Sequence, residues 1–140
     1  VSHLPSRREF HHRLEFKIEQ LEAGLSSGFA LVFLDLDNFG ALNEKEGHQF
    51  GNKLLKTIGQ RLRHSIRGKD VVGRLDADLF GIILSDIQQP DIIGTVVSKI
   101  RAAINSPMHL DQRQLHITAS IGATVCPGDT TVADRLFHHA

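Results

Sequence analysis

The sequence contains one cysteine, Cys126, and neither tryptophan nor tyrosine. A single cysteine excludes an internal disulfide framework, which fits a protein of a reducing compartment. No apolar run approaches the roughly 20 residues that a helix needs to cross a bilayer, and residues 1–5 lack the apolar core of a signal peptide. We therefore expect a cytoplasmic domain, although a longer parent protein could be anchored in a membrane.

An excess of charge of one sign is also missing, because 16 basic residues balance 16 acidic ones. A protein that binds a phosphate backbone requires an excess of basic residues. We therefore expect no nucleic-acid polymer as main partner, whereas a local basic pocket could still hold a small anion. The histidines are scattered, and the two adjacent pairs, His11-His12 and His138-His139, lack the spacing of a metal site.

Length and periodicity indicate one folded domain of the α+β class. With 140 residues, 41% of them hydrophobic, the chain can bury a hydrophobic core without disulfides or a structural metal. Apolar periodicity predicts helices at 5–24, 39–43, 54–66, 90–107 and 132–140, and strands at 29–34, 71–75, 80–84 and 115–121, the last continuing toward 125. This order, with a hairpin among the late strands, predicts a ferredoxin-like α/β sandwich whose central, mostly antiparallel sheet is flanked by helices.

Acidic residues follow the first predicted strand directly. Asp35 and Asp37 end the apolar run 29–34, and Asp78, in the hairpin turn, could supply another carboxylate if the hairpin pairs beside that strand. Two carboxylates at neighbouring strand ends support metal-assisted phosphoryl chemistry. A structural alternative stays open, in which Asp37 or Asn38 only caps the next helix.

Two other protein classes with an Asp-x-Asp strand end fit this sequence poorly. A phosphohydrolase with an aspartate nucleophile would continue with Gly-Thr, whereas Asn38-Phe39 follows here. A phospho-receiver would need regular alternation of strands and helices and a late lysine, whereas the last lysine, Lys99, falls in a predicted helix. These differences argue against both classes.

Six short motifs occur in order along nearly the whole chain. They are Leu4-Pro5-Ser6-Arg7-Arg8-Glu9-Phe10, Asp35-Leu36-Asp37-Asn38-Phe39-Gly40-Ala41-Leu42-Asn43, Gly47-His48-Gln49-Phe50-Gly51-Asn52-Lys53-Leu54-Leu55, Arg67-Gly68-Lys69-Asp70, Arg74-Leu75-Asp76-Ala77-Asp78-Leu79-Phe80 and Ala119-Ser120-Ile121-Gly122-Ala123. Together they resemble the motifs LPNRRxF, DLDxFKxIN, GHxxGDxLL, RxxD, RLGGDEF and xSIGx of the GGDEF (diguanylate cyclase-like) domain family. The resemblance implies the sandwich of the nucleotidyl cyclase type.

The resemblance also implies a GTP site. Active GGDEF domains condense two GTP molecules into cyclic di-GMP, and each protomer of a dimer holds one GTP with Mg²⁺ or Mn²⁺. By resemblance, Asp35, the backbone carbonyl of Leu36 and Asp78 would hold the metal, and Asp78 would be the catalytic carboxylate of the signature turn. The residues implied at the nucleotide are Phe39, Asn43 and Asn52.

The signature turn departs from the family pattern, reading Asp76-Ala77-Asp78-Leu79-Phe80 where the family has GGDEF. Asp76 and Ala77 replace two glycines that let the hairpin backbone approach the nucleotide. Asp76 also adds a negative charge near a polyanion, and Leu79 replaces a glutamate. Each change opposes GTP turnover.

Two further departures point the same way. Asn52 replaces an aspartate that accepts hydrogen bonds from guanine, which weakens a charge-assisted contact, and Gly40 replaces a phosphate-facing lysine. We therefore expect a degenerate, non-catalytic member that acts as a regulatory or nucleotide-binding module for GTP or cyclic di-GMP. A weakly active cyclase and a scaffold that binds no nucleotide stay open as alternatives.

Arg67 and Asp70 match the RxxD motif, which in the family forms an inhibitory site for the cyclic di-GMP product. An arginine can grip phosphate or guanine with two N–H groups, and an aspartate can accept from a guanine edge. The alternative is an arginine at a helix end beside an aspartate on the surface.

Residues 1–140 are interpreted as a single GGDEF-like domain taken from a larger multidomain protein and lacking the family's last helix. Degenerate members often stand beside an EAL phosphodiesterase domain. A covalently linked sensor or EAL domain is therefore an expected partner, and the family's dimeric site suggests a homodimer.

Overall fold

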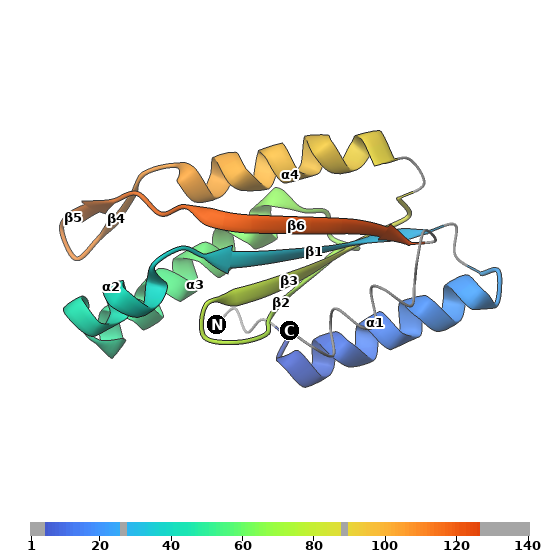
Figure 1. The fold of residues 1–140 in the computed structure, drawn as a ribbon, viewed down its shortest axis with the longest axis horizontal. Coiled ribbons are helices and arrows are strands. Elements are labelled where there is room, and N and C mark those ends of the chain that lie inside the picture. Colours follow the sequence, from blue (N-terminus) through green and yellow to red (C-terminus); the bar gives the residue numbers. More distant parts are fainter. Residues whose placement is uncertain (1–4, 26–27, 88–89, 127–140) are drawn as a thin grey trace.

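A four-stranded antiparallel sheet in the order β2-β3-β1-β6 forms the centre of the computed structural model, which describes residues 5–25, 28–87 and 90–126 (Figure 1). The strands are β1 (Phe29–Leu36), β2 (Val71–Arg74), β3 (Leu79–Ser85) and β6 (Ala119–Cys126). The predicted ferredoxin-like sandwich is confirmed by this strand order. The helix predicted at 132–140 and the pair His138-His139 lie outside the described residues.

In the described part of the chain, four helices cover the two faces of the sheet: α1 (Arg7–Glu22), α2 (Phe39–Glu46), α3 (His48–Ser65) and α4 (Pro90–Asn105). Successive residues of β1 point to opposite faces. Leu31 packs in a cluster with Phe10 of α1, whereas Val32 packs in the main cluster with Ile58 of α3 and Ile100 of α4. The sheet therefore lies between α1 on one side and α3 and α4 on the other, as Figure 1 shows for α1 and α4. Among the described helices, none has the length and apolar character that crossing a bilayer requires.

The helix predicted at 54–66 begins earlier, at His48, and α2 extends beyond its predicted end to Glu46. Gly47 separates the two helices with a φ of 95°, a conformation that glycine adopts without steric cost. One residue of this kind is enough to turn the chain, so the predicted break is correct but much shorter than expected.

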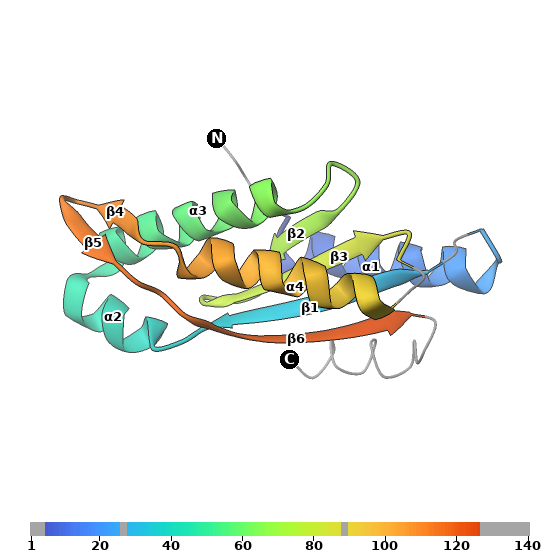
Figure 2. The ribbon, with the colours of Figure 1, turned by 90° about the horizontal axis from the view of Figure 1, so that it is seen from above.

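The strand predicted at 115–121 is confirmed from Ala119 onward, including its continuation toward 125, but its first part is wrong. Instead, β4 (Met108–Leu110) and β5 (Arg113–Leu115) form a separate two-stranded sheet, and β6 begins only at Ala119. Asp111 and Gln112 have φ values of 51° and 65°, which closes a tight hairpin turn between β4 and β5. Figure 2 shows this hairpin beside α2 and the start of α3. Apolar and polar residues alternate without interruption from the end of β5 into β6, so periodicity could not reveal the break between these two strands.

Candidate functional site

Asp35 lies near the end of β1, next to the turn between β2 and β3. In the sheet it is paired with Leu79 of β3 and Ser120 of β6. The N–H of Leu36 donates to the carbonyl oxygen of Asp78 at 3.0 Å. The long antiparallel pairing of β1 with β3 therefore brings the β1 end and the turn together, as the sequence predicted.

The carboxyl groups of Asp35 and Asp78 meet at this strand end. The pKa of Asp35 is raised, first because of burial, then because of repulsion from the charges of Asp78 and Asp37, and also because of a hydrogen bond with Asp78. A carboxylate whose ionisation is disfavoured by a neighbouring carboxylate is the electrostatic setting that a bound cation relieves.

Asp37 has a structural function that the sequence did not reveal. Its two carboxylate oxygens accept from the hydroxyls of Thr118 at 2.7 Å and Ser120 at 2.9 Å, and its N–H donates to the Thr118 carbonyl at 3.0 Å. Asn38 occupies the cap position of α2 without a side-chain cap hydrogen bond. The capping alternative for Asp37 and Asn38 is therefore wrong, since Asp37 ties β1 to β6.

The signature turn, residues 75–79, is closed by its own hydrogen bonds. The N–H groups of Leu75 and Asp76 both donate to the Leu79 carbonyl, at 2.7 and 3.2 Å. The N–H of Ala77 donates to Oδ1 of Asp76 at 2.8 Å, and the Arg74 guanidinium donates to the carbonyl of Ala77 at 3.3 Å. Asp76 and Ala77 are both exposed, so the added carboxylate and methyl group stand on the outer surface of the turn.

The last two signature positions are apolar and point to opposite sides of β3. Leu79 packs against the cluster beneath α1, and Phe80 is fully buried in the main cluster. Leu79 therefore anchors the hairpin to the α1 side, at the position where the family pattern has a carboxylate.

The predicted nucleotide residues gather around the junction of α2 and α3. Nδ2 of Asn43 lies 3.2 Å from Nδ1 of exposed His48, and the Asn43 side chain covers the Cα of Gly51. Phe39 is buried, 6% exposed, in the main core, whereas Asn52 is exposed on α3. The contacts of Asn43 with His48 and Gly51 were not foreseen from the sequence, although both residues belong to the motif at 47–55.

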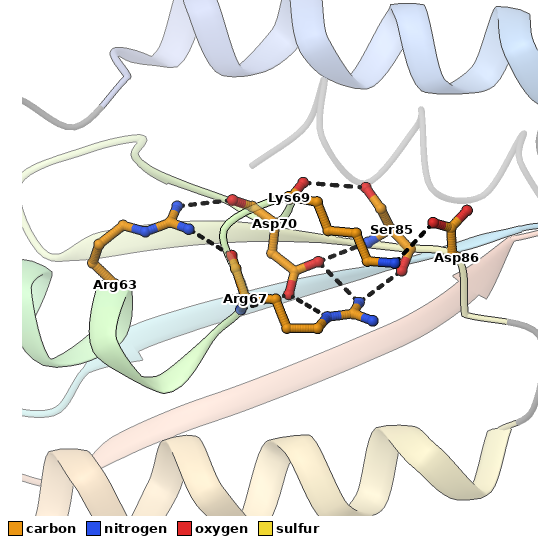
Figure 3. A network of polar contacts seen from close by, with 6 residues as sticks. All are labelled: Arg63, Arg67, Lys69, Asp70, Ser85 and Asp86. Atoms are coloured by element: carbon orange, nitrogen blue, oxygen red, sulfur yellow. Dashed lines mark hydrogen bonds and ion pairs between the residues drawn. The ribbon is translucent and has the colours of Figure 1, made fainter.

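Arg67 and Asp70 form a bidentate pair (Figure 3). Nε and Nη2 of Arg67 donate to the two oxygens of Asp70, each at 2.9 Å. The carboxylate also accepts from the backbone N–H groups of Arg67 at 2.9 Å and Ser85 at 3.0 Å. The Arg63 guanidinium closes the segment by donating to the carbonyls of Arg67 and Asp70.

The two side chains of this pair differ in solvent exposure. Asp70 is 2% exposed, whereas the Arg67 side chain is 48% exposed. Burial would raise the pKa of Asp70, but the hydrogen bonds from Arg67 and from the N–H groups of Ser85 and Arg67 outweigh burial and lower that pKa. The alternative of a surface aspartate is therefore wrong, and whether Arg67 and Asp70 bind a product nucleotide stays a prediction.

The family model described as "Diguanylate cyclase, GGDEF domain" matches residues 1–140. The chain belongs to the GGDEF domain family. MucR of Pseudomonas aeruginosa, a bifunctional diguanylate cyclase/cyclic di-GMP phosphodiesterase, is 33% identical over 100% of this chain, which spans 20% of MucR. The cyclic di-GMP phosphodiesterase NbdA of the same organism is 35% identical over 81% of this chain and 14% of NbdA. The chain thus spans a fifth or less of these relatives.

Solved structures confirm the GGDEF fold. The crystal structure of the GGDEF domain of DgcB from Caulobacter crescentus, in complex with c-di-GMP, superimposes with a TM-score of 0.83 and 21% sequence identity, over 95% of this chain and 80% of that chain. At this identity the likeness bears on the fold alone.

Within this GGDEF domain, the donor set at the strand end fits a divalent cation only in part. No group of three or more His, Cys, Asp or Glu side chains that could hold a metal occurs among the described residues. Asp35, Asp78 and the carbonyl of Leu36 would supply a partial set of oxygen ligands. Mg²⁺ is commonly bound by one or two carboxylates together with water and substrate phosphates, so the pair fits a cation that arrives with a nucleotide.

Proposed function

We propose that this GGDEF domain is a regulatory, nucleotide-binding module of cyclic di-GMP signalling and that it does not turn GTP over efficiently. The observation that carries the proposal is the hydrogen bond from the Ala77 N–H to the Asp76 carboxylate at 2.8 Å. In a glycine turn this N–H would be free to meet a phosphate. Here it is already bound, and the group that binds it carries a negative charge that repels a polyanion.

The position of Leu79 supports the same conclusion. Its side chain packs against the cluster beneath α1 and offers no oxygen to a metal or a proton. The turn thus lacks one of the family's two consecutive carboxylates, and Asp78 alone remains beside Asp35. A site with fewer anionic ligands holds a divalent cation less tightly.

Nucleotide binding without turnover is supported by what the site keeps. Asp35, Asp78 and the Leu36 carbonyl would hold Mg²⁺ or Mn²⁺, which when bound would neutralise phosphate charge. Asn43 offers an amide to guanine, and exposed Asn52 offers a neutral oxygen acceptor from the neighbouring helix.

At the RxxD segment, we propose that Arg67 is the residue that meets cyclic di-GMP and that Asp70 holds Arg67 in place. Asp70 is buried and already accepts four hydrogen bonds, whereas the half-exposed guanidinium of Arg67 remains open on one side. The DgcB domain has c-di-GMP bound, which makes this dinucleotide the first ligand to test.

The relatives suggest where such a module works. MucR is named as both cyclase and phosphodiesterase, and NbdA as a phosphodiesterase, and both are several times longer than this chain. We propose that the domain is linked to a sensor or an EAL phosphodiesterase domain and reports nucleotide occupancy to it, with a second copy as a further partner through homodimerisation.

The decisive experiment separates turnover from binding. The chain is incubated with GTP and Mg²⁺ or Mn²⁺, and cyclic di-GMP is measured by mass spectrometry, with Asp35→Asn as matched control. We expect no steady product formation from either protein. Steady formation that is lost in Asp35→Asn would instead establish a weakly active cyclase.

Binding is measured by calorimetric titration with GTP and with cyclic di-GMP. We expect GTP binding that depends on the divalent cation and weakens in Asp35→Asn, and cyclic di-GMP binding that weakens in Arg67→Ala but not in Lys56→Ala, an exposed position on α3. The absence of binding by both nucleotides would overturn the proposal in favour of a scaffold.

A further inference from the structure

A continuous groove lies between α1 and the segment 68–72, apart from the Asp35–Asp78 pair. It consists of two adjoining cavities, of about 330 Å³ and about 250 Å³. Both are lined by Arg13, Lys69 and Val71, which makes them one feature. The combined volume falls in the range of ligand-binding clefts.

One half of the groove is apolar. Its lining includes Ile83, which is buried in the floor, and Phe16, whose ring stands at the rim. Phe16 is 58% exposed, and only two other large hydrophobic side chains among the described residues are similarly exposed. An exposed aromatic ring beside an open cavity is a characteristic of contact surfaces rather than of solvated helix faces.

Basic side chains line both cavities of the groove, although the chain as a whole is neutral. The basic residues that line the two cavities are His12, Arg13, Lys17, Arg63 and Lys69. The single acidic lining residue is Asp70, whose carboxylate is already neutralised by Arg67.

These cations are not equally available. Arg63 donates to backbone carbonyls, and Lys69 pairs with Asp86 at 3.0 Å. Within the described residues, Arg13 and Lys17 make no hydrogen bond or ion pair, although the charge of Lys17 acts on Asp86. They lie four residues apart on α1, which places their charges about 6 Å apart along one side of the groove.

We propose that this groove binds an extended acidic peptide segment of a partner, with one large apolar side chain in the cavity beside Phe16 and flanking carboxylates on Arg13 and Lys17. In an extended chain, side chains on the same face are about 7 Å apart, so a carboxylate two residues from the apolar side chain lies within reach of the long Arg13 and Lys17 side chains. A compact anion would contact the basic side chains alone and would leave the apolar surface beside Phe16 uncovered. The inference does not depend on nucleotide binding.

The probe is a fluorescein-labelled peptide, Gly-Asp-Glu-Phe-Asp-Glu-Gly, with binding to the 140-residue chain followed by fluorescence anisotropy. One control peptide carries Asn and Gln in place of Asp and Glu, and the other carries Ala in place of Phe. We expect saturable binding by the first peptide, and binding about tenfold or more weaker for each control, because charge and apolar contact both contribute.

Variants locate the binding site. Arg13→Glu is expected to weaken peptide binding about tenfold, and Phe16→Ala is expected to weaken it by a smaller factor. Lys56→Glu makes the same charge change on α3, across the sheet, and is expected to leave binding unchanged. Circular dichroism checks that each variant is folded, and Lys17→Gln replaces Arg13→Glu if that variant is not.

Three results would overturn the proposal. The first is the absence of saturable binding by the acidic peptide. The second is an equal loss of affinity in Arg13→Glu and Lys56→Glu, which would show a general charge effect. The third is that inorganic pyrophosphate shifts the NMR signals of the Arg13 and Lys69 amides while the peptide does not, which would assign the groove to a small anion.

Discussion

A methyl group on the Cα of Gly51 would lie 2.1 Å from Oδ1 of Asn43. The glycine on α3 therefore leaves the space in which the Asn43 side chain of α2 rests, with Nδ2 of Asn43 3.2 Å from Nδ1 of His48. The contact sets the orientation of the side chain that we propose for guanine recognition.

Gly51→Ala tests this orientation. The Asn43 side chain can rotate away from the added methyl group, and alanine favours a helix over glycine by about 1 kcal/mol. We expect thermal stability to change little, while GTP affinity falls about tenfold because the Asn43 amide is displaced, which corresponds to about 1.4 kcal/mol. Calorimetry measures the affinity. Gly94→Ala, an exposed glycine of α4 with open space around it, is the matched control and should leave affinity unchanged.

Asp70→Ala is expected to lower the free energy of unfolding by about 2–4 kcal/mol, because it leaves the backbone N–H groups of Arg67 and Ser85 without their acceptor and the Arg67 guanidinium with the Ser85 carbonyl alone. Asp86→Ala removes the aspartate of the exposed pair with Lys69, and exposed pairs contribute little. Urea unfolding of both variants measures the difference. Similar midpoints for the two variants would contradict a structural function for Asp70.

Stability should also fall in acid in a way that depends on Asp70. Its pKa in the folded chain lies below the ordinary value of 3.8, so the ionised form stabilises the fold above that value. This stabilisation is lost as the pH falls through the folded pKa. We expect the thermal unfolding midpoint of the wild type to fall as the pH is lowered below about 4. The midpoint of Asp70→Asn should be lower than that of the wild type at pH 6 and should change less between pH 6 and pH 3.

The central sheet could be predicted from the sequence because its strands are short apolar runs bounded by polar residues. The sequence made the approach of Asp78 to Asp35 conditional on pairing of the hairpin with the first strand, and the structure has this pairing between β1 and β3. The β4–β5 hairpin could not be predicted, because its turn depends on positive φ at Asp111 and Gln112, neither of which is a glycine.

The hydrogen-bond partners of the side chains in the site could not be predicted from the sequence either. Asp37 looked like a metal ligand or a cap, yet it binds two hydroxyls that lie more than 80 residues later in the chain. The burial of Asp70 could not be read from an RxxD pattern, since it depends on how the segment docks against Ser85. Contacts between residues far apart in the sequence depend on strand register and packing, and hydrophobic periodicity gives no information on either.

Asp35→Asn is expected to stabilise the chain at neutral pH. Because the pKa of Asp35 is raised in the fold, its ionised form is disfavoured there, and this penalty applies above the folded pKa. The penalty declines as the pH falls and is absent below the ordinary value of 3.8. Thermal unfolding should therefore show a higher midpoint for Asp35→Asn than for the wild type at pH 7 and equal midpoints at pH 3. A lower midpoint at pH 7 would show that the fold does not disfavour the ionised form of Asp35.

Arg61 of α3 fixes the end of α4. Its guanidinium donates to the carbonyls of Ala103 at 2.9 Å, Ser106 at 2.6 Å and Pro107 at 2.9 Å, which otherwise have no helical partner. We expect Arg61→Ala to lower the free energy of unfolding by about 1–3 kcal/mol. Arg61→Lys should recover only part of this loss, because a single ammonium group keeps the favourable charge at the helix end but cannot reach three acceptors. Equal stability of the lysine variant and the wild type in urea would show that charge alone holds the two helices together.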